Sequence, residues 1–350
     1  MTERVDVVVI GGGQAGLAIG YYLRRAGLSF VILDDRERSG GAWQSTWPSL
    51  RLFSPAQYSS LPGRPMPASP RANPDASHVI DYLADYEERY RLPVRRPIQV
   101  DHVEHGPEGF RVATHYEDWL ARIVVNTTGT WSQPFWPSMP GQSTFQGVQV
   151  HSAWYRGPEQ FENSSVLVVG GANSGAQIAA DLVGSAEVTW CLRGEPRYLP
   201  DDVDGRELFR VASQQVRARA TGQPDPGGVS DLGDIVAVPP VRRARDAGLL
   251  TAQPMFEHFS PGGVVWPNGR THCIEAVVWC TGFRPALRHL RRLDLRESDG
   301  TIDLNGTAST RIPGLYLVGY GDWTGPGSAT LIGVGATAKA TANDIRSKLV

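Results

Sequence analysis

Two glycine clusters carry the clearest chemical signal in this sequence of 350 residues. Residues 11–16 (GGGQAG) follow the apolar run 7–10, and residues 170–175 (GGANSG) follow the similar run 166–169. In a G-x-G-x-x-G turn between a strand and a helix, the glycines permit a tight turn, close approach of backbone to a pyrophosphate, and close helix–strand packing. The helix N-terminus offers free N–H groups and a partial positive charge to the phosphates. Because the pattern occurs twice, it predicts two dinucleotide-binding units.

A charged residue stands at the same offset behind each cluster, where the next strand ends. It is Asp34 in the first unit and Arg193 in the second. A carboxylate accepts hydrogen bonds from a ribose diol and repels a 2′-phosphate, whereas a guanidinium pairs with that phosphate. The first unit is therefore expected to hold FAD or NAD, and the second can hold NADP. The structural alternatives are a turn or helix-capping role for Asp34, beside Asp35, and a solvated loop position for Arg193. Ala172 replaces the second glycine of the second cluster, so the pyrophosphate is expected to lie slightly further from the backbone there.

The elements that must position these residues can be predicted from the apolar pattern. In each unit a buried strand precedes the glycines, a helix follows them, and a second buried strand follows the helix. We expect strands over 5–10, 29–33, 122–126, 166–169, 188–192, 276–280 and 315–318, helices over 14–25, 78–90 and 176–184, and Pro-rich loops over 61–74 and 133–141.

This order predicts an α/β protein with two Rossmann-like dinucleotide-binding domains. The strand over 315–318 comes after the second unit has closed, so it is most simply placed in the first domain. We therefore expect an FAD-binding domain in two pieces, 1–160 and 283–350, with an NAD(P)-binding domain, 161–282, inserted between them. Residues 194–250 contain charged, helix-compatible sequence and a Pro/Gly segment, and are interpreted as an excursion from the second domain.

Composition excludes several classes of protein. The 34 basic and 36 acidic side chains give a formal net charge of -2, which leaves no excess of cations for general nucleic-acid binding. No apolar run approaches the roughly 20 residues that cross a bilayer, and the N-terminal residues show no secretory leader. The three cysteines, Cys191, Cys273 and Cys280, form no C-x-x-C pair, and the histidines show no metal-ligand spacing. We therefore expect a cytoplasmic protein without a metal site.

Further motifs resemble the flavin-containing monooxygenases, the class B flavoprotein monooxygenases, over almost the whole chain. Residues 40–43 (GGAW) match a G-G-x-W motif, and residues 127–129 (TTG) resemble an A-T-G turn. The most specific match is residues 145–155 (FQGVQVHSAWY), which fit F-x-G-x-x-x-H-x-x-x-Y/F position for position. Residues 279–283 (WCTGF) resemble a later A-T-G-Y element.

The resemblance implies which residues hold the cofactors. Those that resemble FAD contacts of the family are Gly11, Gly13, Gln14, Ala15, Gly16, Asp34, Asp35, Gly41, Trp43, Val100, Gly129, Asp322 and Leu331. Those that resemble its NADP contacts are Gly170, Asn173, Ser174, Gly175 and Arg193. Asp322 resembles the ribityl-binding Asp of two-domain flavoproteins. Its alternative role is the N-cap of a helix from about Ala329, whose N-terminus would point at the flavin pyrimidine.

Three positions concern the reaction itself, and none is assigned as catalytic. Phe53 stands where the family usually has an Asn, in L-R-x-N-x-P, that helps to position the peroxide and the nicotinamide. The lifetime of the oxygenated flavin is therefore open. His151 is expected to be structural, keeping the two domains in register at their junction. Phe145 and Tyr155 are expected to be packing residues for the same reason.

The resemblance implies an FAD-dependent monooxygenase that consumes NADPH, or NADH, forms a flavin C4a-hydroperoxide with O2, and oxygenates a small soft nucleophile such as a sulfide or an amine. Tyr155 stands where Baeyer–Villiger enzymes carry Trp, which favours heteroatom oxidation over ketone oxidation. Residues 49–67 and 199–206 resemble the compact bacterial branch encoded in arsenic-resistance operons. The alternatives are a ferredoxin-type reductase, an NAD(P)H oxidase, and a non-enzymatic FAD-binding redox sensor. A homodimer is expected at the level of the family, and no nucleic-acid or membrane partner.

Overall fold

The apolar run before the first glycine cluster forms a central strand, β1 (Thr2–Ile10), in the computed structural model. Its side chains point alternately into two buried layers. Val7 and Val9 pack with α1 (Gln14–Arg25) and α7 (Val334–Leu349), whereas Val8 and Ile10 pack in the core on the other face of the sheet. All four are at most 4% exposed. Burial on both faces explains why the run is continuously apolar instead of alternating.

The structure describes residues 2–71, 73–203, 233–297 and 301–350, together with isolated positions between 204 and 232. Within these ranges, no helix is long and apolar enough to cross a membrane. The same ranges contain no group of three or more His, Cys, Asp or Glu side chains that could hold a metal ion.

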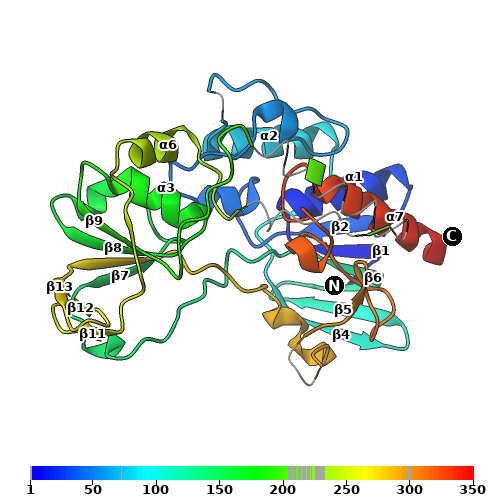
Figure 1. The fold of residues 1–350 in the computed structure, drawn as a ribbon. Coiled ribbons are helices and arrows are strands. Elements are labelled where there is room, and N and C mark those ends of the chain that lie inside the picture. The colour runs from blue at the N-terminus through cyan, green and yellow to red at the C-terminus, as the bar shows by residue number, and fades with distance from the viewer. Residues whose placement is uncertain are drawn as a thin grey trace.

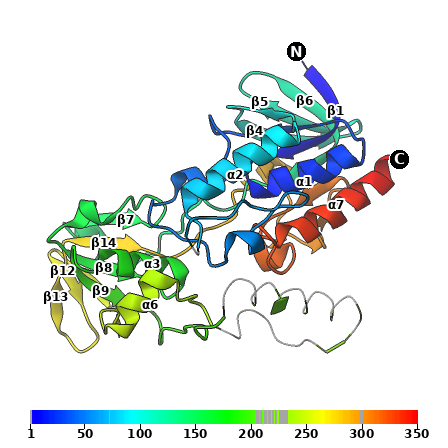
Figure 2. The ribbon, with the colours of Figure 1, turned by 90° about the horizontal axis from the view of Figure 1, so that it is seen from above.

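The first sheet has nine strands, including β1. The others are β2 (Phe30–Leu33), β3 (Val94–Arg95), β4 (Val100–Gly106), β5 (Gly109–Thr114), β6 (Asp118–Asn126), β15 (Leu304–Asn305), β16 (Ala308–Ser309) and β17 (Leu315–Leu317). Strands β17, β6, β1, β2 and β3 are parallel, and β4, β5 and β6 form an antiparallel meander. The meander packs on one face of the parallel strands. On the other face, Figure 2 shows α1 beside α7 and α2 (Ala76–Arg89).

The second sheet has five parallel strands in the order β10-β9-β8-β14-β7. Its elements are β7 (Val148–His151), β8 (Ser165–Val169), β9 (Glu187–Cys191), β10 (Ala252–Gln253) and β14 (Ala276–Trp279), with helices α3 (Asn173–Leu182) and α6 (Pro239–Asp246) on one face. A small antiparallel sheet, β11 (His258–Ser260), β12 (Gly263–Val265) and β13 (Thr271–Cys273), covers the other face. Strand β8 repeats the burial of β1, since Val166 and Val168 face the helices while Leu167 and Val169 face the small sheet.

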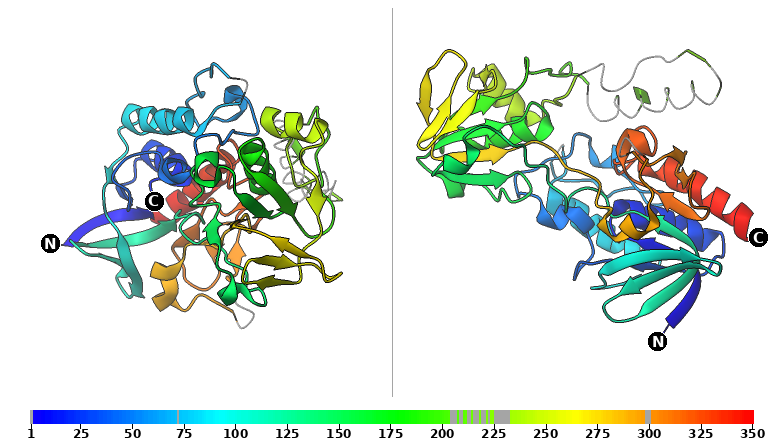
Figure 3. Two further views of the ribbon diagram at one scale, coloured as in Figure 1. Left: turned by 90° about the vertical axis from the view of Figure 1, so that its left-hand side faces the viewer. Right: turned by 90° about the horizontal axis from the view of Figure 1, so that it is seen from below.

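The two sheets form two lobes, and the chain passes between them twice (Figure 1). It leaves the first sheet after β6 through residues 127–147 and returns through residues 280–287. Backbone hydrogen bonds join the two passages: Phe135 N to Gly282 O (2.9 Å), Arg284 N to Gln133 O (2.8 Å) and Ala286 N to Gly129 O (2.9 Å). The right-hand view of Figure 3 shows the lobes at opposite ends of the molecule.

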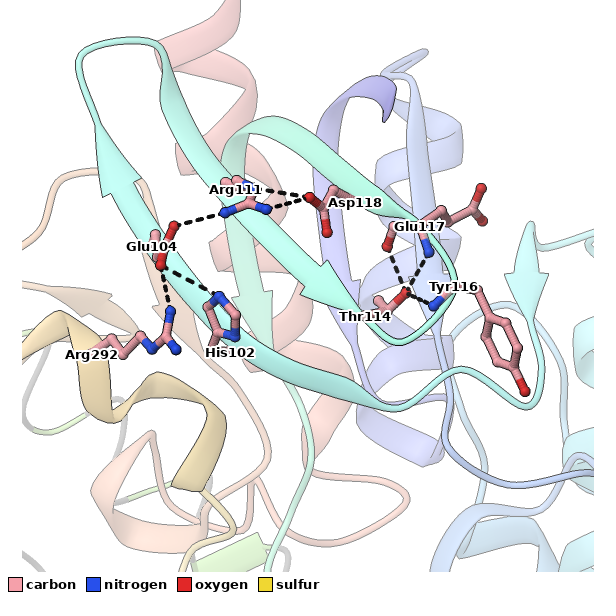
Figure 4. A network of polar contacts seen from close by, with 8 residues as sticks. All are labelled: His102, Glu104, Arg111, Thr114, Tyr116, Glu117, Asp118 and Arg292. Carbon is pink, nitrogen blue, oxygen red and sulfur yellow. Dashed lines mark hydrogen bonds and ion pairs between the residues drawn. The ribbon is translucent and has the colours of Figure 1, made fainter. Parts of the chain in front are cut away.

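An exposed network of charges fastens the meander to the returning chain (Figure 4). Arg111 of β5 donates to Glu104 of β4 (3.1 Å) and to Asp118 of β6 (2.6 Å), and Arg292 of the short helix η5 (Arg288–Leu293) donates to Glu104 (2.6 Å). The hydrogen bonds from Arg292 and Arg111 keep the pKa of the Glu104 carboxyl below its usual value. Because water screens exposed ion pairs, this network is expected to contribute little to the stability of the fold.

The expected fold class is confirmed, including the insertion of the second parallel sheet into the chain of the first. One boundary differs: β7 precedes residue 161, yet it pairs with β14 of the second sheet. The meander of β4 and β5 and the small sheet of β11–β13 had no counterpart among the predicted elements. Within the expected excursion 194–250, the structure describes α6, while most of 204–232 lies outside the described residues.

Candidate cofactor-binding site

The first glycine turn connects β1 to α1 with no room for a side chain at Gly11, Gly12 or Gly16. Gly11 has a φ of +107°, and its N–H donates to Leu33 O (2.7 Å). A Cβ on Gly16 would lie 1.9 Å from Gly11 O, so the first turn of α1 packs directly on this loop. Thr127 Oγ1, from the residue after β6, also bonds to Gly11 O (2.8 Å). The start of α1 therefore lies at the carboxyl end of β1, where its free N–H groups can bind phosphate.

Gln14 joins this turn to two distant segments. Its Nε2 donates to Ala329 O (2.7 Å), and its Oε1 accepts from Trp43 Nε1 (3.1 Å). Gly41 has a φ of +54°, and a Cβ on it would lie 2.8 Å from Gly13 Cα. The atom nearest to a Cβ on Gly13 would be Gly41 Cα at 3.8 Å, which is an ordinary van der Waals distance. The sequence motifs around residues 11–16 and 40–43 thus meet at one place, together with the C-terminal segment.

Asp34 lies at the end of β2 and is 3% exposed. Its carboxylate packs against Gly12, where an added Cβ would be 2.6 Å from Oδ2. Oδ2 also accepts a hydrogen bond of 2.7 Å from Arg96 Nε. Asp35, the next residue, is exposed. Gly12 lies in the first glycine cluster, but no sequence motif pointed to its contact with Asp34 or to Arg96.

Apart from Ala15 of α1, the other residues predicted to contact FAD lie on segments that follow β2 and β6 or on the C-terminal segment. Ala15 meets Gly319, where a Cβ would be 2.8 Å from the Ala15 Cβ. Leu331 is buried, and Gly129, three residues after the end of β6, has a φ of +63°. Val100 begins β4, two residues after Ile98, which donates a backbone hydrogen bond to Asp34.

Asp322 lies exposed in a short turn, η6 (Gly321–Trp323). The helix expected from about Ala329 begins instead at Val334, and its N-cap is Gly333, because residues 325–332 form turns. The alternative role of Asp322 as the N-cap of that helix is therefore wrong.

The second glycine turn has the same geometry as the first. Gly170 has a φ of +143°, and a Cβ on Gly175 would lie 2.0 Å from Gly170 O. Trp190 Nε1 donates to that same oxygen (2.8 Å), which fixes the turn to β9. Asn173 Oδ1 accepts from Val236 N (2.8 Å), so its side chain holds the chain before α6, and Ser174 beside it is half-buried.

Arg193 follows β9 at the carboxyl edge of the second sheet and is exposed. The structure gives its guanidinium no hydrogen bond or ion pair with any described residue. An exposed cation at this place is free to pair with an anionic ligand. Asp34, at the corresponding place in the first sheet, is by contrast a buried anion.

His151 sits at the junction of the lobes and is fully buried. Its Nδ1 accepts from Ala153 N (3.1 Å), so Nε2 carries the proton and donates to Gly282 O (3.1 Å). Burial lowers the pKa of His151, although the bond to Gly282 opposes this, and the ring is neutral at pH 7. Phe145 is also buried and packs on Phe259, with ring centroids 5.1 Å apart.

Tyr155 and Phe53 line the core that the second lobe shares with the segment after Trp43. Tyr155 is fully buried, its OH donates to Asp181 Oδ2 (2.8 Å), and its ring meets Trp47 edge-on at 6.1 Å. Phe53 is half-buried and packs against the same core. Residues 47–53 of the first lobe therefore belong partly to the core of the second.

Replacing Tyr155 by Phe should cost about 1–2 kcal/mol, because Asp181 loses a buried hydrogen-bond donor while the ring packing stays. We expect a melting temperature lower by a few degrees, with the ratio of bound flavin to protein unchanged. A loss of flavin in Y155F would contradict a purely structural contact.

A buried polar network lies at the carboxyl end of β6, and of its members only Thr128 belongs to a motif named above. Asn126 donates to Tyr320 Oη (2.6 Å), and its Oδ1 is 2.7 Å from His289 Nε2. Thr128 Oγ1 lies 3.0 Å from the same Tyr320 oxygen and donates to Ala286 O (2.7 Å). Burial lowers the pKa of His289 to about 4, so its ring is neutral and Nε2 donates to Asn126.

These features fit two dinucleotides. Each turn places a helix N-terminus at the carboxyl edge of a parallel sheet, where nucleotides bind in folds of this kind. A Cβ at Gly11 or Gly16 would collide with backbone atoms, whereas one at Gly13 would lie at an ordinary van der Waals distance from its nearest neighbour. The residues at the strand ends, a buried carboxylate and an unpaired guanidinium, suit a ribose diol and a 2′-phosphate respectively.

Comparison with known proteins identifies the class. Residues 8–205 match the family described as pyridine nucleotide-disulphide oxidoreductase. This match covers more than half of the chain, and the chain belongs to that family.

Individual relatives narrow the class further. The chain is 47% identical to a flavin-containing monooxygenase from Stenotrophomonas maltophilia of known structure, with a TM-score of 0.91 over 99% of this chain and 100% of that one. It is 31% identical over 350 residues to an uncharacterized CzcO-like oxidoreductase from Geobacillus kaustophilus, covering 99% of each. A probable indole-3-pyruvate monooxygenase, YUCCA8 from Arabidopsis thaliana, is 26% identical over 89% of this chain and 83% of its own length. The resemblance to flavin-containing monooxygenases is confirmed, and the chain is an oxidoreductase of this flavin-dependent type.

Proposed function

We propose that this protein is an FAD- and NADPH-dependent monooxygenase that oxygenates a small molecule at a soft nucleophilic atom, such as a sulfide or an amine. One observation carries the proposal. Two glycine turns of similar geometry are each followed by a helix and a strand, and the residues after these strands carry opposite charges: Asp34, which is buried, and Arg193, which is exposed. The relatives named above support the oxygenase chemistry, and the two turns support the pair of nucleotides. The cytoplasmic location and the homodimer stay predictions.

The proposal assigns the cofactors to the two turns. FAD would be held by the first turn and the segments that meet it: Gly11, Gly13, Gln14, Ala15, Gly16, Asp34, Asp35, Gly41, Trp43, Val100, Gly129, Asp322 and Leu331. NADPH would be held by Gly170, Asn173, Ser174, Gly175 and Arg193. When bound, this pair supplies hydride transfer from nicotinamide to flavin and activation of O2, so that one oxygen atom enters the substrate and the other leaves as water.

The chain's own contribution is to orient the two lobes and to exclude water between them. Arg51 N donates to Gln177 Oε1 of α3 (3.3 Å), and Arg156 Nη1 donates to Ser45 O (3.1 Å), so residues 45–51 of the first lobe are tied to the second. At the paired passages, Trp131 stacks on Phe283 with centroids 4.9 Å apart, which supplies an apolar surface at the junction. Since His151 is fixed as a neutral structural ring, it supplies no proton in this proposal.

The proposed activity is tested with the purified yellow protein, a thioether as probe substrate, and isotopically labelled O2. We expect NADPH oxidation to match O2 uptake and one labelled oxygen atom to appear in the sulfoxide. Rapid reduction of a ferredoxin without O2 uptake would show a reductase instead. Hydrogen peroxide with no labelled product from any sulfide or amine would show an oxidase.

Replacing Arg193 by Ala tests the choice of NADPH. We expect the NADPH-to-NADH ratio of kcat/KM to fall about 10- to 100-fold, because one charge-assisted pair with the 2′-phosphate is lost. Arg243→Ala, at an exposed arginine of α6, is the matched control and should leave the ratio unchanged. An unchanged ratio in R193A would show that another residue selects the coenzyme.

A further inference from the structure

The carboxylate of Asp34 belongs to a buried group of three charges. Arg96 Nε donates to Asp34 Oδ2 (2.7 Å), while its two terminal nitrogens donate to Glu87 Oε1 (2.6 Å) and Oε2 (2.8 Å). The side chains of Arg96, Asp34 and Glu87 are 11%, 4% and 18% exposed. One guanidinium therefore joins the carboxylate at the end of β2 to a carboxylate on α2.

Arginine is the side chain that can make this connection. Its planar fork grips Glu87 with two parallel bonds and still directs Nε at Asp34, which a lysine ammonium cannot reproduce. A buried carboxylate without a partner is costly, and the hydrogen bond from Arg96 offsets that cost at Asp34. The hydrogen bonds to Glu87 and the charges of Asp34 and Glu87 raise the pKa of Arg96 against the opposing effect of burial.

The backbone around Arg96 holds Asp34 as well. Asp34 N donates to Arg95 O (3.1 Å), and Ile98 N donates to Asp34 O (2.8 Å). The Asp34 carboxylate also packs against Gly12, where an added Cβ would be nearest to the same Oδ2. Main chain and side chain are thus fixed together, and the structure gives Oδ1, unlike Oδ2, no bond to a described residue.

Helix α2, which carries Glu87, is held firmly in the first lobe. Helix α2 starts at the N-cap Asp75, whose Oδ1 accepts from His78 N (3.1 Å). Its inner side chains Val79, Leu83 and Tyr86 are fully buried in the core of the first lobe. Glu87 therefore offers Arg96 a fixed anchor.

We propose that Arg96 is a positioning residue for the first nucleotide site, holding Asp34 so that Oδ1 faces the adenosine ribose. This inference rests on the proposed function, in which the first turn binds FAD. Arg96 is bonded to Oδ2 of Asp34 and thereby orients Oδ1, the acceptor that remains. Arg96 therefore affects FAD affinity only by positioning Asp34.

The test measures the dissociation constant of FAD for deflavinated protein and the melting temperature of the same FAD-free protein. Arg96→Met should weaken FAD binding at least tenfold, while the matched control Arg89→Met, at an exposed arginine of α2, should stay within twofold of wild type. Asp34→Asn should also weaken binding. In that background Arg96→Met should add less than a threefold further loss, because its route to FAD is already broken. Arg96→Lys should recover part of the loss.

Each outcome separates the hypotheses. Wild-type affinity in R96M, or losses in R96M and D34N that multiply in the double variant, would overturn the role of Arg96. A wild-type protein that binds no FAD would overturn the proposed function, and this inference with it. If R96M does not fold, R96K carries the comparison: at least threefold weaker binding than R89M supports the proposal, and equal binding overturns it.

Discussion

Alanine at Gly16 is expected to remove bound flavin and to lower the free energy of unfolding by about 4 kcal/mol or more. The added Cβ would lie 1.9 Å from Gly11 O. That oxygen cannot yield, because the turn is held by the bond of Gly11 N to Leu33 O and by Thr127. The start of α1 must then move away from the turn, which spoils the phosphate site as well as the packing. The flavin-to-protein ratio and the melting temperature measure both effects.

The second lobe offers a matched experiment. A Cβ on Gly175 would lie 2.0 Å from Gly170 O, in a turn that serves only the second sheet. G175A should therefore keep its flavin and lose most NADPH-dependent reduction. Gly106→Ala, where an added Cβ meets no atom within 4 Å, is the control and should behave as wild type. Loss of flavin in G175A, or its retention in G16A, would reverse the assignment of the two turns.

Acid should destabilise the protein through His289. Burial lowers the pKa of this histidine from 6.5 to about 4, so the unfolded chain binds a proton in that interval while the folded chain does not. The free energy of unfolding should therefore decrease as the pH falls from 6.5 to about 4. The contribution of this one residue is about 3 kcal/mol, complete above pH 6.5 and lost near pH 4.

Unfolding by urea at a series of pH values, with excess FAD present, measures this slope. His289→Gln keeps a donor for Asn126 but has no titrating ring, so its stability should change less between pH 6.5 and 4. His115→Gln, at an exposed histidine of the meander turn, should retain the wild-type slope. If the free energy of unfolding changed equally with pH in the wild type and in H289Q, His289 would not be the cause of the acid destabilisation.

The parts of the fold that could be predicted are those whose causes are local. The runs at β1 and β8 are buried on both faces, so their continuous apolar sequence identified them. The glycine turns could also be predicted, because the strand, the turn and the helix are adjacent in the chain. Strands β11, β12 and β13 have three residues each and carry no pattern of that length, so their pairing depends on the sheet they cover.

The parts of the site that sequence patterns missed depend on distant partners. Arg96 is 62 residues from Asp34, and His289 is 163 residues from Asn126. Nothing near Arg96 in the chain distinguishes it from Arg95, which is exposed. Asp34 itself was predictable because its offset from Gly11 is set by one strand–helix–strand unit.

The pairing of the two passages between the lobes bears on how one lobe can be inserted into the other. Backbone hydrogen bonds join residues 129–135 of one passage to residues 282–286 of the other, so the chain enters and leaves the inserted lobe at one place. Adjacent entry and exit points are the condition under which one domain can be inserted into another without disturbing it. A protease that cuts only one passage would therefore leave the inserted lobe attached through the other.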